Sequence, residues 1–551
     1  MLNFKMRDTA KRRSILRSAV SCFVAVCFSS VLSGCLPGFD TDDGVSSNSL
    51  SGGPEENRTA VNRSVKTSFL SFQSGLGLGP RPENEQGAAP SLLSASFASI
   101  FPRRGVESNP SVAGETLNVP EAPITPPVQS LNKFYAAVAA MASGKRSEPI
   151  TILHLGDDQI TEDHFSGELR EHFQSRFGNA GHGLMTPGLF PAHGMKTDRG
   201  GQWAIANSAA GAPGPYGITG VRLSSGASDA WVRLTASQGA FDWLEVTFAS
   251  GPAQGTAVVS VDGSVRLVPT ATRAEDETSI RITGKAKEIL IKPRGDGEIA
   301  LLSIATGVNA RGFRYVNLGL PGATAETPEK WNPAFVQRDL DKLKPDLIVF
   351  GYGTREGFKD NLDTVQYERH LQFLMAKFQQ AAPQASFLIV GPPDAARLPS
   401  FAGAGGAQVC RALNAQETVN YERMLGRDDE KLGRWHSPPR LDGVRSALRR
   451  VASASGAFFW DWARFMGGPC SIHAWSSGKP PLASQDHVTL TAAGTDKSAR
   501  ALFVELMGGY DAYQRSLIAQ TQAKVIVTAA ASTQPAKVVK AKPAQKVRHV
   551  Q

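Results

Sequence analysis

Short apolar runs alternate with amphipathic segments through the centre and second half of this chain. The runs at 150–155, 347–350 and 387–390 are typical of buried parallel strands. Apolar residues recur at helical spacing over four longer segments, 129–143, 365–381, 440–452 and 492–507. Strands that alternate with helices predict a parallel sheet covered on both faces, so we expect an α/β protein with a three-layer α/β/α domain.

The pattern changes between 196 and 304, where apolar and polar residues alternate without a helical period. Asp262-Gly263 between two alternating segments is a hairpin signal. Several short strands with glycine-rich turns are typical of a β-sandwich of about 100 residues. We therefore expect a sandwich at 196–304 inserted between the two parts of the α/β domain, 126–195 and 305–510.

The first 35 residues have the pattern of an export signal. Basic residues precede an apolar run at 19–28, which is short for a membrane span, and the segment ends in L-S-G-C at Cys35. This ending resembles the bacterial lipobox, in which the cysteine thiol carries the lipid, although a plain signal peptide is the alternative. We expect an exported, membrane-anchored lipoprotein. Leu36 favours the periplasmic face of the outer membrane, and the arginine pair at 12–13 leaves Sec and Tat export both open.

Positive charge lies at the two ends of the chain. The net charge is +9 over 551 residues, but the leader and the lysine-rich segment 521–551 together carry a larger positive charge than the whole chain. The body between them is near neutral, so we expect no nucleic-acid partner. Residues 36–125 are rich in Ser, Gly, Pro and Asn, which predicts a disordered linker, and 511–551 are expected to form a basic flexible tail.

Four segments in order resemble the blocks of SGNH/GDSL hydrolases. They are G-D-D at 156–158, N-L-G-L-P-G-A-T at 317–324, G-T-R-E at 353–356 and D-H-V-T-L-T at 486–491. Family members have G-D-S in the first block, G-T-N-E in the third and D-x-x-H-L-T in the fourth. Within this family, the segments most resemble the branch of periplasmic peptidoglycan O-acetylesterases, and the resemblance covers about residues 129–508. It implies an SGNH-like sheet with a carbohydrate-binding-module-like sandwich inserted between the first two blocks.

The resemblance also implies which positions would carry the chemistry. Ester hydrolysis there needs a serine nucleophile, a histidine base oriented by an aspartate, and N–H donors for the oxyanion. The equivalent positions hold Asp158 (nucleophile), Gly322 (oxyanion donor), Arg355 (asparagine donor), Asp486 (orienting acid) and Thr489 (base). Three of the five are replaced, and His487 is the one nearby histidine that could rescue the base. We predict an ion pair between Asp158 and Arg355 that blocks the oxyanion hole.

These replacements leave three functions open. The first, which we favour, is a non-catalytic protein that binds a cell-envelope polysaccharide, peptidoglycan, or a partner enzyme such as an active paralogue. The second is an active carbohydrate O-acetylesterase or acyltransferase with an atypical site. The third is a structural envelope protein whose basic tail contacts peptidoglycan or anionic lipid. We expect no cofactor, and no metal because the histidines show no H-x-x-x-H spacing.

Several other residues have simpler interpretations. Cys410 and Cys470 are the only cysteines after Cys35, and an oxidising compartment would let them pair, with two separate thiols as the alternative. Asp157 is expected to cap the helix that follows it. Glu162 and Asp163 are expected to complement a helix dipole. The tryptophans at 460 and 462 are expected in the core rather than on a sugar platform.

Overall fold

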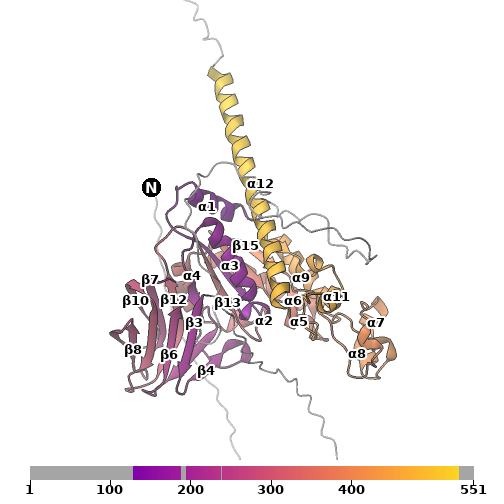
Figure 1. Cartoon of the computed structure of the whole chain (residues 1–551), viewed down its shortest axis with the longest axis horizontal. Helices are drawn as coiled ribbons and strands as arrows, with labels where there is room; N and C mark the ends of the chain where they lie inside the picture. Colours follow the sequence, from indigo (N-terminus) through magenta and orange to yellow (C-terminus); the bar gives the residue numbers. More distant parts are fainter. Residues whose placement is uncertain (1–127, 188–193, 238, 533–551) are drawn as a thin grey trace, which may run out of the picture. The chain divides into compact units, whose positions relative to one another are not determined.

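The computed structural model describes residues 128–187, 194–237 and 239–532, all within one compact unit (Figure 1). The expected signal, Cys35 and the expected linker at 36–125 lie outside the described residues. No helix in the described ranges is both long enough and apolar enough to cross a membrane.

A parallel sheet of five strands forms the centre of the α/β body. Its order is β13-β1-β14-β15-β16, and every neighbouring pair is parallel. The strands are β1 (Ile150–Gly156), β13 (Phe313–Gly319), β14 (Leu347–Gly351), β15 (Ser386–Val390) and β16 (Phe458–Trp460). β1 is buried along its whole length, which explains why its sequence is mostly apolar rather than alternating, with Thr151 and His154 buried as well.

Helices cover both faces of this sheet. Alternate residues of the strands belong to two different hydrophobic clusters; Ile152 faces one and Leu153 the other. One face packs against α1 (Asn132–Ala142), α3 (His164–Phe177) and α12 (Ala492–Ser532), the other against α4 (Pro333–Leu343), α6 (Thr364–Ala381) and α9 (Leu441–Ser455). The short helices are α2 (Asp158–Thr161), α5 (Thr354–Gly357), α7 (Ala415–Val419), α8 (Tyr421–Leu425), α10 (Trp462–Met466) and α11 (Ser471–Ser477). The expected three-layer arrangement is present.

The inserted part consists of two antiparallel sheets. One has the order β10-β7-β12-β5-β4 with β2 also paired to β12, and the other has the order β3-β6-β11-β8-β9. The strands are β2 (Gly183–Met185), β3 (Met195–Gly200), β4 (Ala204–Asn207), β5 (Val221–Ser225), β6 (Trp231–Ala236), β7 (Phe241–Ser250), β8 (Thr256–Val261), β9 (Ser264–Pro269), β10 (Asp276–Ala286), β11 (Glu288–Pro293) and β12 (Ile299–Gly307). The predicted hairpin joins β8 to β9, with Asp262 and Gly263 both at positive φ.

The boundaries of the insert differ from those expected at 196 and 304. β2 lies in the range assigned to the first part of the α/β domain, but it pairs with β12 in the sandwich. The strands of the insert therefore run from Gly183 to Gly307. A three-residue strand is too short to show an alternating pattern, so no signal for it is present in the sequence.

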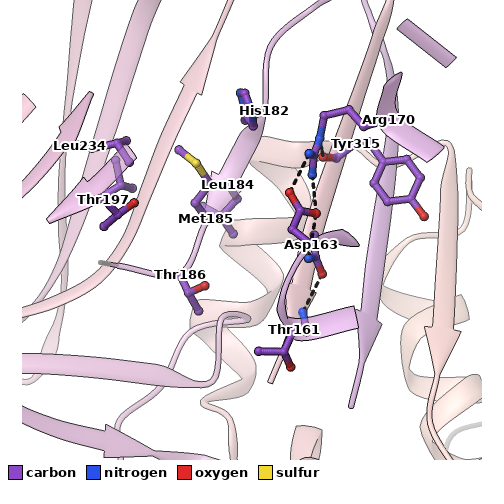
Figure 2. Close-up of a pocket in the computed structure, with 13 residues that line it drawn as sticks. Thr161, Asp163, Arg170, His182, Leu184, Met185, Thr186, Thr197, Leu234 and Tyr315 are labelled. Atoms are coloured by element: carbon purple, nitrogen blue, oxygen red, sulfur yellow. Dashed lines mark hydrogen bonds and ion pairs between the residues drawn. The ribbon is translucent and has the colours of Figure 1, made fainter. Parts of the chain in front are cut away.

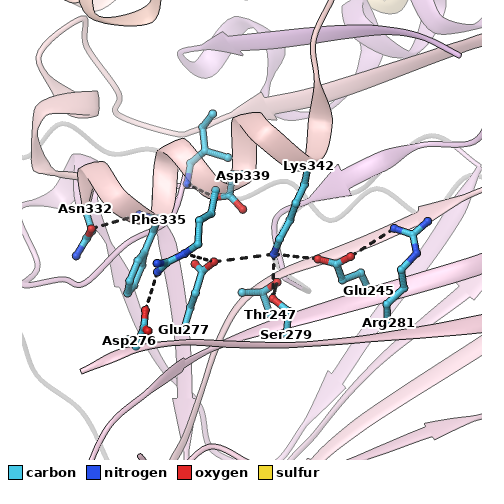
Figure 3. A network of polar contacts seen from close by, with 12 residues as sticks. Glu245, Thr247, Asp276, Glu277, Ser279, Arg281, Asn332, Phe335, Asp339 and Lys342 are labelled. Carbon is cyan, nitrogen blue, oxygen red and sulfur yellow. Dashed lines mark hydrogen bonds and ion pairs between the residues drawn. The ribbon is translucent and has the colours of Figure 1, made fainter. Parts of the chain in front are cut away.

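The insert is fixed to α4 by packing and by charge. Figure 3 shows Lys342 of α4 facing Glu245 of β7 and Glu277 of β10. Arg338 lies 2.7 Å from both Asp276 and Glu277, and Lys342 lies 2.9 Å from Glu245. Hydrophobic residues of the sandwich and of the body belong to one cluster, so the two share a core.

α12 corrects the expectation of a flexible tail from residue 511. The helix continues to Ser532, well beyond the predicted helix at 492–507. Tyr510 is buried, and its ring lies 6.2 Å from that of Tyr135 in α1. Residues 533–551 lie outside the described ranges.

Candidate functional site

Three glycines bring the ends of three strands together at the carboxyl edge of the sheet. Gly156 of β1 is in register with Gly319 of β13 and with Gly351 of β14. A Cβ atom on Gly156 would lie 2.6 Å from the carbonyl oxygen of Gly351, so the close approach requires glycine. The segments that follow these strands, at 157–158, 320–323 and 352–356, therefore start beside one another at the edge where α/β folds hold their ligands.

Asp157 and Asp158 follow β1 directly and have different environments. The Asp157 side chain accepts a hydrogen bond from the N–H of Gln159 at 3.1 Å, which confirms its predicted capping role. Asp158 is the first residue of α2, and its side chain is 48% exposed. The acid at the nucleophile position is thus reachable from solvent, whereas its neighbour is buried.

Asp158, Gly322 and Arg355 meet at one point. The N–H of Gly322 donates to both carboxylate oxygens of Asp158, at 3.3 and 3.2 Å. Nη2 of Arg355 lies 3.3 Å from Oδ2 of the same carboxylate, so the predicted ion pair is present. Both side chains are about half exposed, so the pair itself adds little stability. The chemical effect of the Asp158 carboxylate is larger, because it accepts the hydrogen bond from the Gly322 N–H that an oxyanion would need.

Asp486 and Thr489 bond to each other. The Thr489 hydroxyl donates to Oδ2 of Asp486 at 2.6 Å, and the N–H groups of Val488 and Thr489 donate to Oδ1 at 2.9 Å. The side-chain amide of Gln159 in α2 donates to the carbonyl of Val488 at 3.5 Å, which joins this segment to the helix that carries Asp158. Asp486, the acid expected to orient a catalytic histidine, therefore accepts its hydrogen bonds from residues of its own loop.

His487 does not rescue the base, contrary to the expectation that it could. Its ring is buried, with Nδ1 at 2.9 Å from the carbonyl of Gln485 and Nε2 at 2.9 Å from Nδ1 of His473. Nε2 is also 3.0 Å from the hydroxyl of Ser476, which is itself buried and cannot meet a substrate. Burial lowers the pKa of His487, because it disfavours the charged imidazolium. The backbone at His487 has φ of 55°, a value that is uncommon outside glycine, and this local turn helps to fix the ring among these partners.

A disulfide fixes the segment whose Trp435 ring covers His487. The Trp435 ring stacks on that of His487 at 3.7 Å between centroids. The backbone of Trp435 pairs with the segment around Cys410, and Cys410 is bonded to Cys470 with a Cα separation of 5.7 Å. Cys470 is the N-cap residue of α11, which carries His473. The pairing of the two cysteines is the one that sequence favoured, whereas nothing in the sequence indicated Trp435 or His473.

Two buried acids lie behind the exposed pair. Asp157 and Glu356 each have one carboxylate oxygen that is buried with no hydrogen-bond partner among the described residues. Burial is the main cause that raises the pKa of Asp157 to about 8, and the nearby Glu356 and Asp158 charges contribute to this rise. Burial also raises the pKa of Glu356. Glu356 was not among the predicted site residues, although it is the last residue of the G-T-R-E block.

Asp163 lies at the N-terminus of α3, where acidic charge was expected, and its side chain also has a partner that the sequence did not indicate. Asp163 is buried at φ of 56°, and the guanidinium of Arg170 binds both of its carboxylate oxygens at 2.8 and 3.0 Å. Figure 2 shows the two side chains facing each other beside Tyr315. The cavity that they line holds about 20 Å³, too little for a sugar, so this pair is structural. The predicted core position of Trp460 and Trp462 is correct, since both are buried.

No protein-family model matches this chain, and no curated protein does. A solved structure of a peptidoglycan O-acetylesterase is 22% identical to it, with a TM-score of 0.56, over 69% of this chain and 96% of that one. A family two carbohydrate esterase from Cellvibrio japonicus is 11% identical, with a TM-score of 0.23, over 57% of this chain and 99% of that one. The first likeness shows the fold: this chain has an esterase-like hydrolase fold of the SGNH type, with an additional β domain.

Proposed function

We propose that this protein is a catalytically degenerate SGNH-type hydrolase that binds cell-envelope glycan, with peptidoglycan as the ligand, and does not cleave its esters. The observation that carries the proposal is the contact of Asp158 with Gly322 and Arg355. A carboxylate at this point repels a developing oxyanion and competes with it for the Gly322 N–H. A carboxylate is also a poor nucleophile towards esters, because attack would give a reactive anhydride.

The missing base supports the same proposal. Thr489 cannot accept a proton near neutral pH, and its hydroxyl donates to Asp486. His487 is engaged with His473 and Gln485 instead. Loss of members of a catalytic triad typically lowers the rate by several powers of ten. The alternative of an active esterase with an atypical site has no supporting contact among the described residues.

The choice of peptidoglycan rests on the fold and on the insert. The similar solved structure is a peptidoglycan O-acetylesterase, and the likeness extends over 96% of that chain. Recognition of a glycan does not require the nucleophile or the base, so binding can survive the loss of both. The insert shares a hydrophobic core with the body. It also contacts the candidate site, because the side-chain amide of Asn207, at the end of β4, donates to the carbonyl of Pro321 at 3.4 Å.

One experiment with O-acetylated peptidoglycan sacculi tests both halves of the proposal. We expect the wild-type chain to sediment with the sacculi and to release no acetate. The combined variant Asp158→Ser, Arg355→Asn and Thr489→His should gain acetate release, because it restores the nucleophile, the donor and the base. The matched control carries Asp158→Ala with the other two changes and should stay inactive. Acetate release by the wild type, or its failure to sediment, would contradict the proposal.

We also propose that Cys35 anchors the protein to the membrane of the envelope, facing the periplasm. The support is the L-S-G-C ending of the export signal. We expect Cys35→Ala to move the protein from the membrane fraction to the soluble fraction after cell lysis. Cys410→Ser serves as the control, because it removes a cysteine without touching the signal. An unchanged distribution of the Cys35 variant would refute the anchor.

A further inference from the structure

A cluster of metal-ligating side chains lies where α3 meets α12, outside the candidate site. Glu168 and His172 are four residues apart on α3, so they lie on the same face of the helix. Asp496 comes from the first turns of α12, which packs against α3. One ligand atom from each of the three side chains lies within 4.8 Å of the others, and all three side chains are partly buried.

The three side chains have the chemistry of a transition-metal site. One imidazole and two carboxylates are ligands that Zn²⁺ accepts, at bond lengths of about 2.0–2.2 Å. Tetrahedral ligands at that distance lie roughly 3–4 Å apart. Small side-chain rotations would therefore bring the present atoms to bonding distance. The imidazole selects for a transition-metal ion over Mg²⁺ or Ca²⁺, which prefer oxygen ligands.

Stacking holds the His172 ring in place, while one of its ring nitrogens has no polar partner among the described residues. Its ring stacks on Phe503 of α12 at 5.1 Å between centroids, which fixes its orientation. Its Nε2 atom is buried and has no hydrogen-bond partner in the described part of the chain. A buried polar atom without a partner is costly, and a bound cation would satisfy it.

Charge at the cluster also points to a cation. Within the described ranges, the Glu168 carboxylate makes no ion pair or hydrogen bond, and Asp496 has only the half-exposed Arg500 at 3.7 Å. Two carboxylates this close repel each other unless a positive charge lies between them. A dication coordinated by both would remove the repulsion.

We propose that Glu168, His172 and Asp496 bind one divalent transition-metal ion, with Zn²⁺ as the probe. The ion would clamp the start of α12 to α3. Because α12 follows the segment of Asp486 and Thr489, and α3 follows the helix of Asp158, the clamp joins the two flanks of the candidate site. This inference does not depend on whether the site is catalytic. The expectation of no metal rested on the lack of a histidine pair, whereas the pattern here is E-x-x-x-H with a distant third ligand.

Isothermal titration of the full chain with ZnCl₂ tests the proposal, after chelation and alkylation of free thiols so that cysteines do not contribute. We expect one ion per chain for the wild type, and an affinity at least tenfold weaker for Glu168→Gln and for Asp496→Asn, since even residues that only support a ligand cost this much. These variants keep the shape of the side chains, and circular dichroism verifies that they fold. His172→Ala should show the same loss.

The matched control is Glu171→Gln, an exposed carboxylate on the same helix that lies outside the cluster. It should bind zinc as the wild type does. The thermal midpoint supplies a second readout, because zinc should raise it for the wild type and the control but not for the three ligand variants. Absence of stoichiometric binding to the wild type, or equal binding by the ligand variants, would overturn the proposal.

Discussion

At the residue scale, two consecutive acids at the end of β1 have opposite roles. Asp158 is half exposed and bonds to Gly322 and Arg355. Asp157 is 2% exposed, caps α2 and lies near the buried Glu356. Burial favours the neutral form of Asp157 and raises its pKa to about 8. The stability of the site should therefore depend on pH through Asp157.

We predict that Asp157→Asn flattens the pH dependence of folding. In the wild type, the folded state keeps the proton up to a pKa of about 8, whereas the unfolded chain loses it at the ordinary value of 3.8. The free energy of unfolding should thus fall as pH rises from about 4 to about 8. The introduced amide would keep an oxygen for the Gln159 N–H and cannot ionise, so the variant should lose part of this slope. Urea unfolding across this pH range measures it.

The control for this prediction is Asp229→Asn, which changes an exposed acid in the insert. It should keep the wild-type slope. Equal slopes for the wild type and Asp157→Asn would mean that Asp157 is ionised in the folded protein throughout this range.

Sequence could predict those site residues whose position follows from chain neighbours or from complementary charge. Asp157 follows a strand and precedes a helix, so its capping role was predictable. The opposite charges of Asp158 and Arg355 indicated an ion pair. The direction of His487 was not predictable, because a positive φ and the packing of Trp435 determine it. The packing depends on a segment that is distant in sequence.

At the scale of elements, α12 differs most from expectation. Its second half is rich in Ala and Gln, a composition that is typical of a tail but is also favourable for a helix. The rings of Tyr510 and Tyr513 pack against Tyr135, which gives the helix a tertiary anchor beyond residue 507. The helices at 365–381 and 440–452 were predicted to within a few residues, because each has a continuous apolar face.

We predict that Tyr510→Ala lowers the free energy of unfolding by about 3 kcal/mol, as is typical for removal of a buried aromatic ring. The ring is buried and contacts Tyr135 and Phe177, so its loss leaves a cavity. Ile518→Ala on the same helix is the control, since that side chain is 58% exposed and should change stability by only a few tenths of a kcal/mol. Chemical denaturation compares the two, and equal effects would show that Tyr510 is not an anchor.

At the scale of the whole molecule, the sequence predicted an α/β body interrupted by a sandwich, because periods of two and of 3.6 residues are distinct. It could not predict how the insert is attached. The ion pairs of Arg338 and Lys342 with β7 and β10 join residues far apart in the chain. The short β2 strand was missed for the same reason, since its place depends on pairing with β12.

The pairing of β2 with β12 has a consequence for the order of folding. β1 and β13 are neighbours in the parallel sheet, yet the whole insert separates them along the chain. Closing so long a loop in an unfolded chain costs conformational entropy and slows the search for the native pairing. Once the insert has folded, β2 and β12 hold its two ends together. What remains between β1 and β13 is then the segment with α2 and α3 on one side of the insert and the short link from β12 to β13 on the other. If the insert folds first, it shortens the loop that must close to pair β1 with β13, and we expect the central sheet to form faster as a result.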